Sequence, residues 1–316
     1  DGEDERSGLI NITLSAGRGT LEGDVFGGAS SQRLGGGALI YGATPVFEDV
    51  TITSAVADEG AGIYLKDGSV SLTRVTIEGC EGVQGAGIFA EGSALILDDV
   101  AILDGHSNFQ GGGIYLDDST LDMLNVRLEE NVANGFGGGI FAQDSDITLD
   151  AVSFTDNYST SQAGGGLYHI GGSLIMEGGV FQENVVDGGG TDVGGGGAYL
   201  KDLDIATFDE TRFIANDSGS SGGGISAIGV DVLELVDLQA RYNVADDSGG
   251  GLYVKTVSTL EIIRPLFYGN EGRYGAGLRV QGSSGVVRHA SFVQNIAREF
   301  GGGLPLEGGG GGSRGR

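Results

Sequence analysis

The stretch Gly111-Gly112-Gly113-Ile114-Tyr115 decides the fold, because close copies of it return along the whole chain. The third glycine of each copy marks a repeat with steps of 25 to 31 residues. These glycines are Gly37, Gly62, Gly87, Gly113, Gly139, Gly166, Gly197, Gly224, Gly251, Gly277 and Gly303. Repeats of this length are typical of solenoids, in which each unit packs only against its neighbours. The sequence therefore predicts one elongated domain.

Each unit contains three short runs in which apolar and polar residues alternate. In the unit at Gly113 these runs lie near residues 114–116, 121–123 and 126–128. Alternation with a period of two indicates strands, and no segment shows sustained helical spacing. Three strands joined by tight turns cannot pair within one coil, so each must pair with its equivalents in the coils above and below. We predict an all-β, right-handed parallel β-helix of about 11 coils, with three strands per coil and essentially no α-helix.

The repeats divide the chain into three parts. Residues 1–34 match the repeat weakly, and we expect an N-terminal cap or an atypical first coil there. Residues 35–303 form the β-helix repeats. Residues 304–316 are rich in glycine and are predicted to be a flexible tail or linker.

Equivalent positions stack in a β-helix, so columns of residues can be compared between coils. One column is expected to form a polar ladder of stacked amides inside the coils. It consists of Asn131, Asn157, Asn184, Asn216, Asn243, Asn270 and Asn295. Cys80 occupies the same column in an earlier coil, which favours a structural, inward-facing thiol over a reactive one.

A second column follows the first strand and predicts left-handed turns, because aspartate and glycine favour that backbone conformation. It consists of Asp67, Gly92, Asp118, Asp144, Gly171, Asp202, Gly229 and Gly282. We interpret these aspartates as turn residues first and as metal ligands only second.

A third column lies next to the inward apolar residue of the first strand and is therefore expected to point outward. Its aromatic members predict an exposed strip that could bind sugar rings or a second protein, although they could also simply stabilise their own sheet. The candidate ligand-binding residues are Tyr64, Phe89, Tyr115, Phe141, Tyr168, Tyr199 and Tyr253. Ser226 and Arg279 stand in the same column and support the outward assignment.

The composition restricts the partners of the chain. A formal charge of −27, with 44 acidic residues against 17 Lys and Arg, disfavours nucleic acid and anionic membrane surfaces. A single cysteine excludes an intramolecular disulfide. No apolar run is long enough for a membrane helix, so we expect no direct membrane insertion.

The glycine tracts and a second motif together resemble the repeats of bacterial polymorphic outer-membrane proteins and related surface β-helices. The second motif is Phe-x-x-Asn. It reads Phe154 to Asn157, Phe181 to Asn184, Phe213 to Asn216, Phe267 to Asn270 and Phe292 to Asn295. This resemblance covers about residues 35–303 and implies a secreted or cell-surface protein that is commonly adhesive.

Catalysis and metal binding have weaker support in the sequence. Many β-helices act on polysaccharides, but the acidic residues fall in turn columns and form no local carboxylate constellation with His, Arg or Lys. His106, His169 and His289 lie in different coils and columns, and His169 falls in a column otherwise occupied by apolar residues. The long glycine-rich corner between Asn184 and Gly195 is either a flexible excursion or a weak calcium site formed by Asp187 and Asp192.

These observations favour a non-catalytic, extracellular or cell-surface structural and adhesive module that binds a glycan or a protein and needs no cofactor, apart from possible calcium. The first alternative is a polysaccharide lyase or glycoside hydrolase. A further alternative is a subunit of an end-to-end extracellular filament, because the terminal coils of a solenoid expose strand edges unless they are capped.

Overall fold

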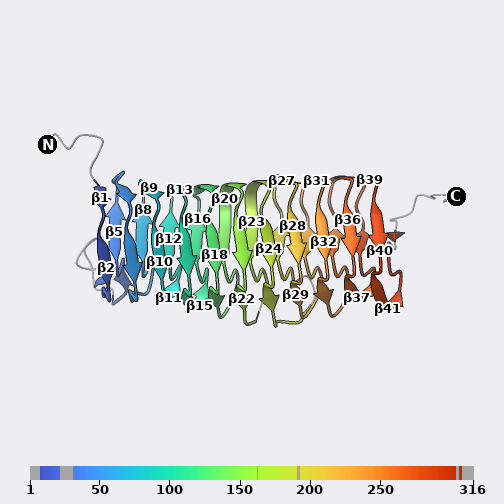
Figure 1. Ribbon diagram of the computed structural model, residues 1–316, viewed down its shortest axis with the longest axis horizontal. Helices are drawn as coiled ribbons and strands as arrows, with labels where there is room; N and C mark the ends of the chain where they lie inside the picture. Colours follow the sequence, from blue (N-terminus) through green and yellow to red (C-terminus); the bar gives the residue numbers. More distant parts are fainter. Residues whose placement is uncertain (1–7, 22–30, 162, 191–192, 304–305, 308–316) are drawn as a thin grey trace.

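The computed structural model describes residues 8–21, 31–161, 163–190, 193–303 and 306–307. These residues form a rod of stacked coils, with the N-terminal coil at one end and the C-terminal coil at the other (Figure 1). Their secondary structure consists of strands, turns and bends, and it contains no α-helix, as predicted. Accordingly, no helix in this part of the chain could cross a membrane.

A full coil contains four short strands, one more than predicted. The first two strands of each coil belong to one 20-stranded sheet, here called sheet A; the third belongs to the 11-stranded sheet B, and the fourth to the nine-stranded sheet C. In two coils the first and second strands are continuous, as β20 (Ile140–Asp150) and β23 (Leu167–Glu177). The fourth strand lies in the corner between the asparagine and the next glycine triplet, where the sequence predicted only a connection.

The strand bounds follow this order in every coil. First strands of sheet A are β5 (Ala38–Tyr41), β8 (Ile63–Lys66), β12 (Ile88–Glu91), β16 (Ile114–Asp117), β26 (Ala198–Lys201), β30 (Ile225–Ile228), β34 (Leu252–Lys255), β38 (Leu278–Gln281) and β42 (Leu306–Glu307). Second strands are β1 (Gly8–Ile10), β6 (Val46–Glu48), β9 (Ser69–Thr73), β13 (Ala94–Asp98), β17 (Thr120–Leu124), β27 (Ile205–Asp209), β31 (Val232–Val236), β35 (Thr259–Ile263) and β39 (Gly285–Arg288).

Sheets B and C contain the shorter strands. Sheet B consists of β2 (Thr13–Ser15), β7 (Thr51–Thr53), β10 (Thr76–Glu78), β14 (Ala101–Leu103), β18 (Arg127–Glu129), β21 (Ser153–Thr155), β24 (Val180–Gln182), β28 (Arg212–Ile214), β32 (Gln239–Arg241), β36 (Leu266–Tyr268) and β40 (Ser291–Val293). Sheet C consists of β11 (Glu81–Gln84), β15 (His106–Gln110), β19 (Val132–Ala133), β22 (Tyr158–Ser159), β25 (Val185–Val186), β29 (Asp217–Ser218), β33 (Val244–Ala245), β37 (Glu271–Tyr274) and β41 (Ile296–Phe300).

Neighbouring coils pair in parallel, with equivalent positions opposite one another. Ile114, for example, pairs with Ile88 of the preceding coil and with Ile140 of the following coil. The predicted parallel β-helix is therefore confirmed. The one antiparallel pair in the described residues joins β3 (Thr20–Leu21) to β4 (Arg33–Leu34) near the N-terminal end.

The inside of the coils is a continuous hydrophobic core of stacked Ile, Leu, Val and Phe side chains. Phe154, Phe181 and Phe213 show the stacking directly, with ring centroids 4.3 Å and 4.6 Å apart on successive coils. Each fully buried side chain of this kind contributes about 1.5–3 kcal/mol. The core therefore runs the length of the rod and stabilises every coil through its two neighbours.

The predicted left-handed turns are present after the first strand. Asp67, Asp118, Asp144 and Asp202 have φ angles between 46° and 53°, and glycines adopt the same region in the other coils. A short polar side chain lowers the cost of this conformation, because it can hydrogen-bond locally. Aspartate therefore serves the backbone at these corners.

The two ends of the repeat region differ from the central coils. Strands β1 and β2 pair in parallel with β6 and β7, so residues 8–15 belong to the first coil. Residues 1–7 and 22–30 of the predicted cap lie outside the described part. Of the predicted flexible tail at 304–316, only Leu306–Glu307 is described, and it forms β42, which pairs with β38.

Candidate functional site

The second position of the first strand carries a column of aromatic side chains, as the sequence predicted. Neighbouring rings are nearly parallel, with centroids 4.8 Å apart for Phe89 and Tyr115 and 5.2 Å apart for Phe141 and Tyr168. The column contains the seven candidate ligand-binding residues. They are Tyr64, Phe89, Tyr115, Phe141, Tyr168, Tyr199 and Tyr253.

The prediction that this column is exposed is wrong, because the seven side chains are only 2% to 9% exposed. They point away from the main core, but the segment that precedes each glycine triplet covers them. Phe136 belongs to this segment, and its ring centroid lies 4.7 Å from that of Tyr168. Leu34 and Ala163 pack into the same cluster from other coils. The rings therefore form a second hydrophobic core and offer no open face to a sugar or protein.

Ser226 interrupts this second core. It pairs with Tyr199 on one side and with Tyr253 on the other, and it is fully buried. Its hydroxyl oxygen has no hydrogen-bond partner. The sequence used this serine as evidence for an exposed column, whereas the structure buries it at an energetic cost.

The asparagine column forms the predicted ladder. The side-chain nitrogen of Asn157 donates to the carbonyl oxygen of Leu128 and to Oδ1 of Asn184, both at 2.9 Å, and the same Oδ1 accepts the backbone N–H of Asn157 at 3.1 Å. This pattern continues from coil to coil and ends at Asn295. The ladder residues are Asn131, Asn157, Asn184, Asn216, Asn243, Asn270 and Asn295.

Two titratable side chains are buried inside the coils. Cys80 faces inward as predicted, and burial raises the pKa of its thiol to about 11, which disfavours the reactive thiolate. His169 lies between Ala142 and Leu200 and hydrogen-bonds through Nε2 to the carbonyl of Ser145 at 2.9 Å. Burial lowers the pKa of His169 to about 4, so the ring is neutral at pH 7 and Nε2 is the donor. Its Nδ1 atom has no partner.

The calcium hypothesis for the long corner stays a prediction. Asp187 accepts a hydrogen bond from the hydroxyl of Tyr158, and Asp192 lies outside the described residues. Within the described ranges, no group of three or more His, Cys, Asp or Glu side chains is arranged to hold a metal ion.

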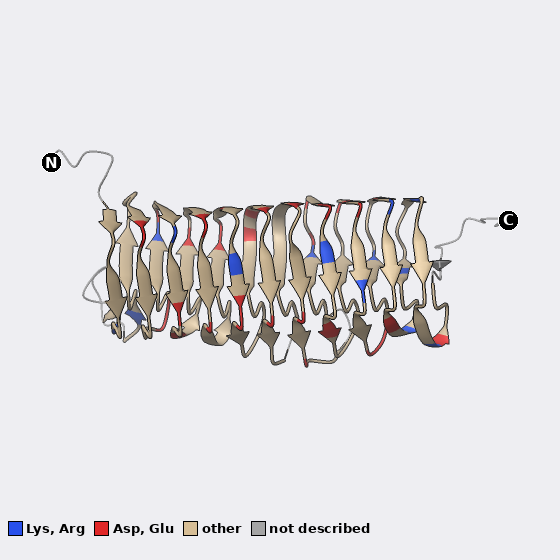
Figure 2. Cartoon of the chain, in the orientation of Figure 1, with Lys and Arg blue, Asp and Glu red and all other residues tan. Residues whose placement is uncertain are grey.

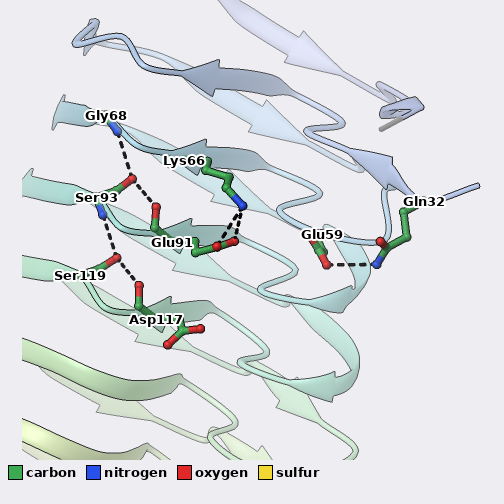
Figure 3. A network of polar contacts seen from close by, with 8 residues as sticks. All are labelled: Gln32, Glu59, Lys66, Gly68, Glu91, Ser93, Asp117 and Ser119. Atoms are coloured by element: carbon green, nitrogen blue, oxygen red, sulfur yellow. Dashed lines mark hydrogen bonds and ion pairs between the residues drawn. The ribbon is translucent and has the colours of Figure 1, made fainter. Parts of the chain in front are cut away.

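A polar surface lies over the N-terminal half of the second core, at the ends of adjacent first strands (Figure 3). Lys66 pairs with Glu91, and Glu91 pairs with Asp117, on β8, β12 and β16. The Lys66 ammonium donates to both carboxylate oxygens of Glu91 at 2.9 Å, and this bond raises the pKa of Lys66. Burial, followed by the nearby charge of Glu91, raises the pKa of Asp117.

Serines brace this surface from behind. The Ser93 hydroxyl donates to the carbonyl of Glu91 at 2.8 Å, and Ser119 makes the equivalent bond to Asp117 (Figure 3). Each serine oxygen also accepts a backbone N–H from the preceding coil. The carboxylates of Glu91 and Asp117 therefore stand on a backbone that is fixed by repeated hydrogen bonds.

An open cavity of about 280 Å³ adjoins these carboxylates. Its lining consists of Ser31, Gln32, Asp58, Glu59, Val83 and Gln84, and it is called the N-terminal pocket below. The Gln32 amide donates to Oε1 of Glu59 at 3.1 Å, and the Gln84 amide donates to Gln110 at 3.2 Å. Burial, and then the charges of Asp117, Glu59 and Glu91, raise the pKa of Tyr115 to about 12, while a hydrogen bond with Gln84 opposes the rise. The pocket, the carboxylates and the phenol of Tyr115 thus share one electrostatic environment.

The sequence analysis missed this pocket, although a signal was present. Glu59, Gln84 and Gln110 stand three residues before the third glycine in consecutive units. Bridges and strand pairs place them next to one another in the structure. A column of long polar side chains beside the glycine triplet could have been recognised before the structure was known.

A second open cavity of about 250 Å³ lies on sheet B and is lined by Arg74, Val75, Thr76, Asp99, Val100, Ala101 and Arg127. The guanidinium of Arg74 is already held by Asp49, at 2.6 Å, and by Glu48. Arg127 lies 3.3 Å from Glu129. Because both arginines have carboxylate partners, this cavity is a weaker candidate for an anion site.

The geometry defines an all-β solenoid of the parallel β-helix class. The sequence model of a family described as "Right handed beta helix region" matches residues 29–181, slightly less than half of the chain. This similarity agrees with the predicted right-handed winding and with a surface-adhesive or polysaccharide-related module. No curated protein and no solved structure matches the chain.

Proposed function

We propose that this protein is a non-catalytic structural and adhesive module of the cell surface or extracellular space, and that it holds a glycan in the N-terminal pocket. The observation that carries this proposal is the cavity of about 280 Å³ beside Gln32, Glu59 and Gln84. Its size is near the lower end of ordinary ligand pockets, which suits a single sugar unit of a longer chain.

The lining chemistry favours a ligand rich in hydroxyl groups. Amides offer both donors and acceptors, carboxylates accept two or more hydrogen bonds, and the Ser31 hydroxyl does both. Val83 is an exposed apolar side chain at the same pocket and can contact the C–H face of a sugar ring. A shallow pocket with this mixture matches the two faces of a pyranose.

The charge of the pocket selects among sugars. Asp58 and Glu59 line it, and Glu91 and Asp117 lie close by, whereas Lys66 is bound to Glu91. An anionic uronate would approach these carboxylates at an electrostatic cost, while a neutral hexose would not and a protonated amino sugar would gain attraction. The proposed ligand is therefore a neutral or amino-sugar glycan.

The rod provides the rigid support that an adhesive site needs. The pocket residues lie on coils fixed by the two hydrophobic cores, so few of their side-chain and backbone motions remain to be lost on binding. Single sugar sites of this kind bind weakly, and a surface that displays many rods gains affinity through multivalency.

Calorimetric titration with short oligomers of glucose, glucosamine and glucuronate tests the proposal. We expect binding of the first two and no detectable binding of the third. Gln32→Ala and Glu59→Gln should each weaken binding at least tenfold, whereas Gln239→Ala on sheet B should not change it. Equal affinity in all variants, or preference for the uronate, would overturn the assignment.

One observation favours a second candidate, a polysaccharide hydrolase. Asp117 has a raised pKa beside the ion-paired Glu91 on the adjacent strand, and glycoside hydrolases use one protonated and one ionised carboxyl group. Release of reducing ends from neutral polysaccharides by the unmodified protein, and its loss in Asp117→Asn, would support this candidate. We expect no release, because the adhesive role requires an intact glycan.

A further inference from the structure

The two ends of the rod present strand edges that lack a neighbour within the described residues. At the C-terminal end, β39, β40 and β41 each pair on one side only, with β35, β36 and β37. At the N-terminal end, β1 and β2 pair only with β6 and β7. These edges lie at opposite ends of the rod (Figure 1). Open edges of this kind are templates for pairing with another chain.

Exposed apolar side chains accompany these edges. In the last coil Phe300 is 70% exposed and Ile296 is 57% exposed, and in the first coil Ile10 is 60% exposed. The inward residues of the terminal coils are also incompletely covered, because they pack on the main core from one side only. These residues are Leu9, Leu14, Val287 and Phe292.

The internal ladder is open at the same end. Every earlier asparagine donates its backbone N–H to Oδ1 of the next asparagine, as Asn270 does to Asn295 at 3.0 Å. Asn295 itself accepts from Asn270 and donates to the carbonyl of Phe267. The last coil is thus shaped to receive one more coil.

The first coil of a second copy fits the last coil in register. Successive pairings place Leu9 in the same inward column as Phe47, and through the coils in that of Val287. Leu14 stands in the inward column that ends at Phe292. If β1 of one copy pairs with β39 of another, and β2 with β40, both apolar columns continue across the junction.

The charges of the two ends favour this orientation. Residues 1–240 hold 8 Lys and Arg against 38 Asp and Glu, a net charge of −30, whereas residues 241–316 hold 9 against 6, a net charge of +3. Figure 2 shows basic side chains among the coils near the C-terminal end and acidic ones along most of the rod. A head-to-tail contact brings the basic end to an acidic body, while contact between two N-terminal ends brings like charges together.

We propose that the partner at these edges is a second copy of this chain, joined head to tail through β1 and β2 of one copy and β39 and β40 of the next. Such a contact is heterologous, and repeating it along the rod axis produces an open filament. This inference does not depend on the proposed glycan site, which lies on the side of the rod.

Sedimentation and light scattering over a range of protein concentrations test this proposal. We expect the unmodified protein to form concentration-dependent linear oligomers. Leu9→Asp blocks the head and Val287→Asp blocks the tail, so each variant alone should be monomeric. An equimolar mixture should give dimers and nothing longer, because one intact tail meets one intact head.

Two further variants separate assembly from folding. Ile175→Asp changes an exposed residue in the middle of the rod and should leave assembly unchanged. Ile10→Arg changes a residue that is already exposed and, in the junction, lies in the column of Arg288, so it should weaken association at least tenfold while the circular dichroism stays the same. A protein that is monomeric at every concentration, or a mixture of blocked variants that does not dimerise, would overturn the proposal.

Discussion

Replacing Asn184 by alanine tests the internal amide ladder at its best-satisfied point. The Asn184 side chain is fully buried and makes four hydrogen bonds. Its Nδ2 donates to the carbonyl of Phe154 and to Oδ1 of Asn216, both at 2.9 Å. Its Oδ1 accepts from the backbone N–H and from Nδ2 of Asn157.

The expected cost follows from the groups that the substitution leaves without partners. Asn184→Ala orphans the Phe154 carbonyl, the Asn157 backbone N–H and one hydrogen of the Asn157 amide. Asn216 keeps one partner, because the backbone N–H of residue 184 still reaches its Oδ1. Three buried polar groups at about 1–3 kcal/mol each predict a loss of about 5 kcal/mol in the free energy of unfolding.

Asn295→Ala is the matched control. Asn295 makes the same kinds of bond, but it lies in the partly exposed last coil, where water can replace the lost partners. We expect this variant to lose about 1 kcal/mol.

Urea unfolding followed by circular dichroism measures both variants. Amide hydrogen exchange localises the effect, because repeat proteins can lose coils separately. We expect faster exchange at residues 154–157 in Asn184→Ala and little change there in Asn295→Ala. If the two variants differ by less than about 1 kcal/mol, the assigned value of a buried ladder bond is wrong.

Two other buried polar groups give stability predictions of the opposite sign. Ser226→Ala removes a hydroxyl without a partner and should raise the unfolding free energy by about 1 kcal/mol, measured by urea unfolding; a loss of stability would mean that the hydroxyl is satisfied. His169→Leu should stabilise the rod most at acidic pH, because the folded-state pKa of about 4 lies below the unfolded value near 6.5. The unfolded chain binds the extra proton between these values, so this histidine destabilises the fold by up to about 3 kcal/mol as pH falls from 6.5 to 4. A pH profile of unfolding that is the same in the variant would contradict the buried, neutral assignment.

The sequence predicted the columns well and their environments less well. Repetition of the Gly113 pattern predicted parallel stacking, and the Asn157 and Asp118 columns are the ladder and the turn that residue chemistry suggested. Those features depend only on the neighbour above and below, which the repeat itself identifies. Such information is present in any single unit and its copies.

The burial of Tyr115 could not be predicted in the same way. Alternation shows that its side chain points away from the main core, but exposure depends on which other segment of the coil covers that face. The covering segment includes the fourth strand, which has two residues in Val132–Ala133 and is too short to show alternation. The outward side of a strand was therefore mistaken for the outside of the protein.

The two cores also decide where a partner can bind. Each repeated aromatic, amide or aliphatic residue is already engaged with its copies in adjacent coils, so changing it weakens the rod before it weakens a binding site. Recognition must depend on residues that vary between coils, such as Gln32 and Glu59 at the N-terminal pocket, or on the terminal strands, where the stacking pattern has no next copy. A substitution in the pocket that removes glycan binding without changing the unfolding curve, and one at Leu9 that removes assembly without changing glycan binding, would separate these two roles in one molecule.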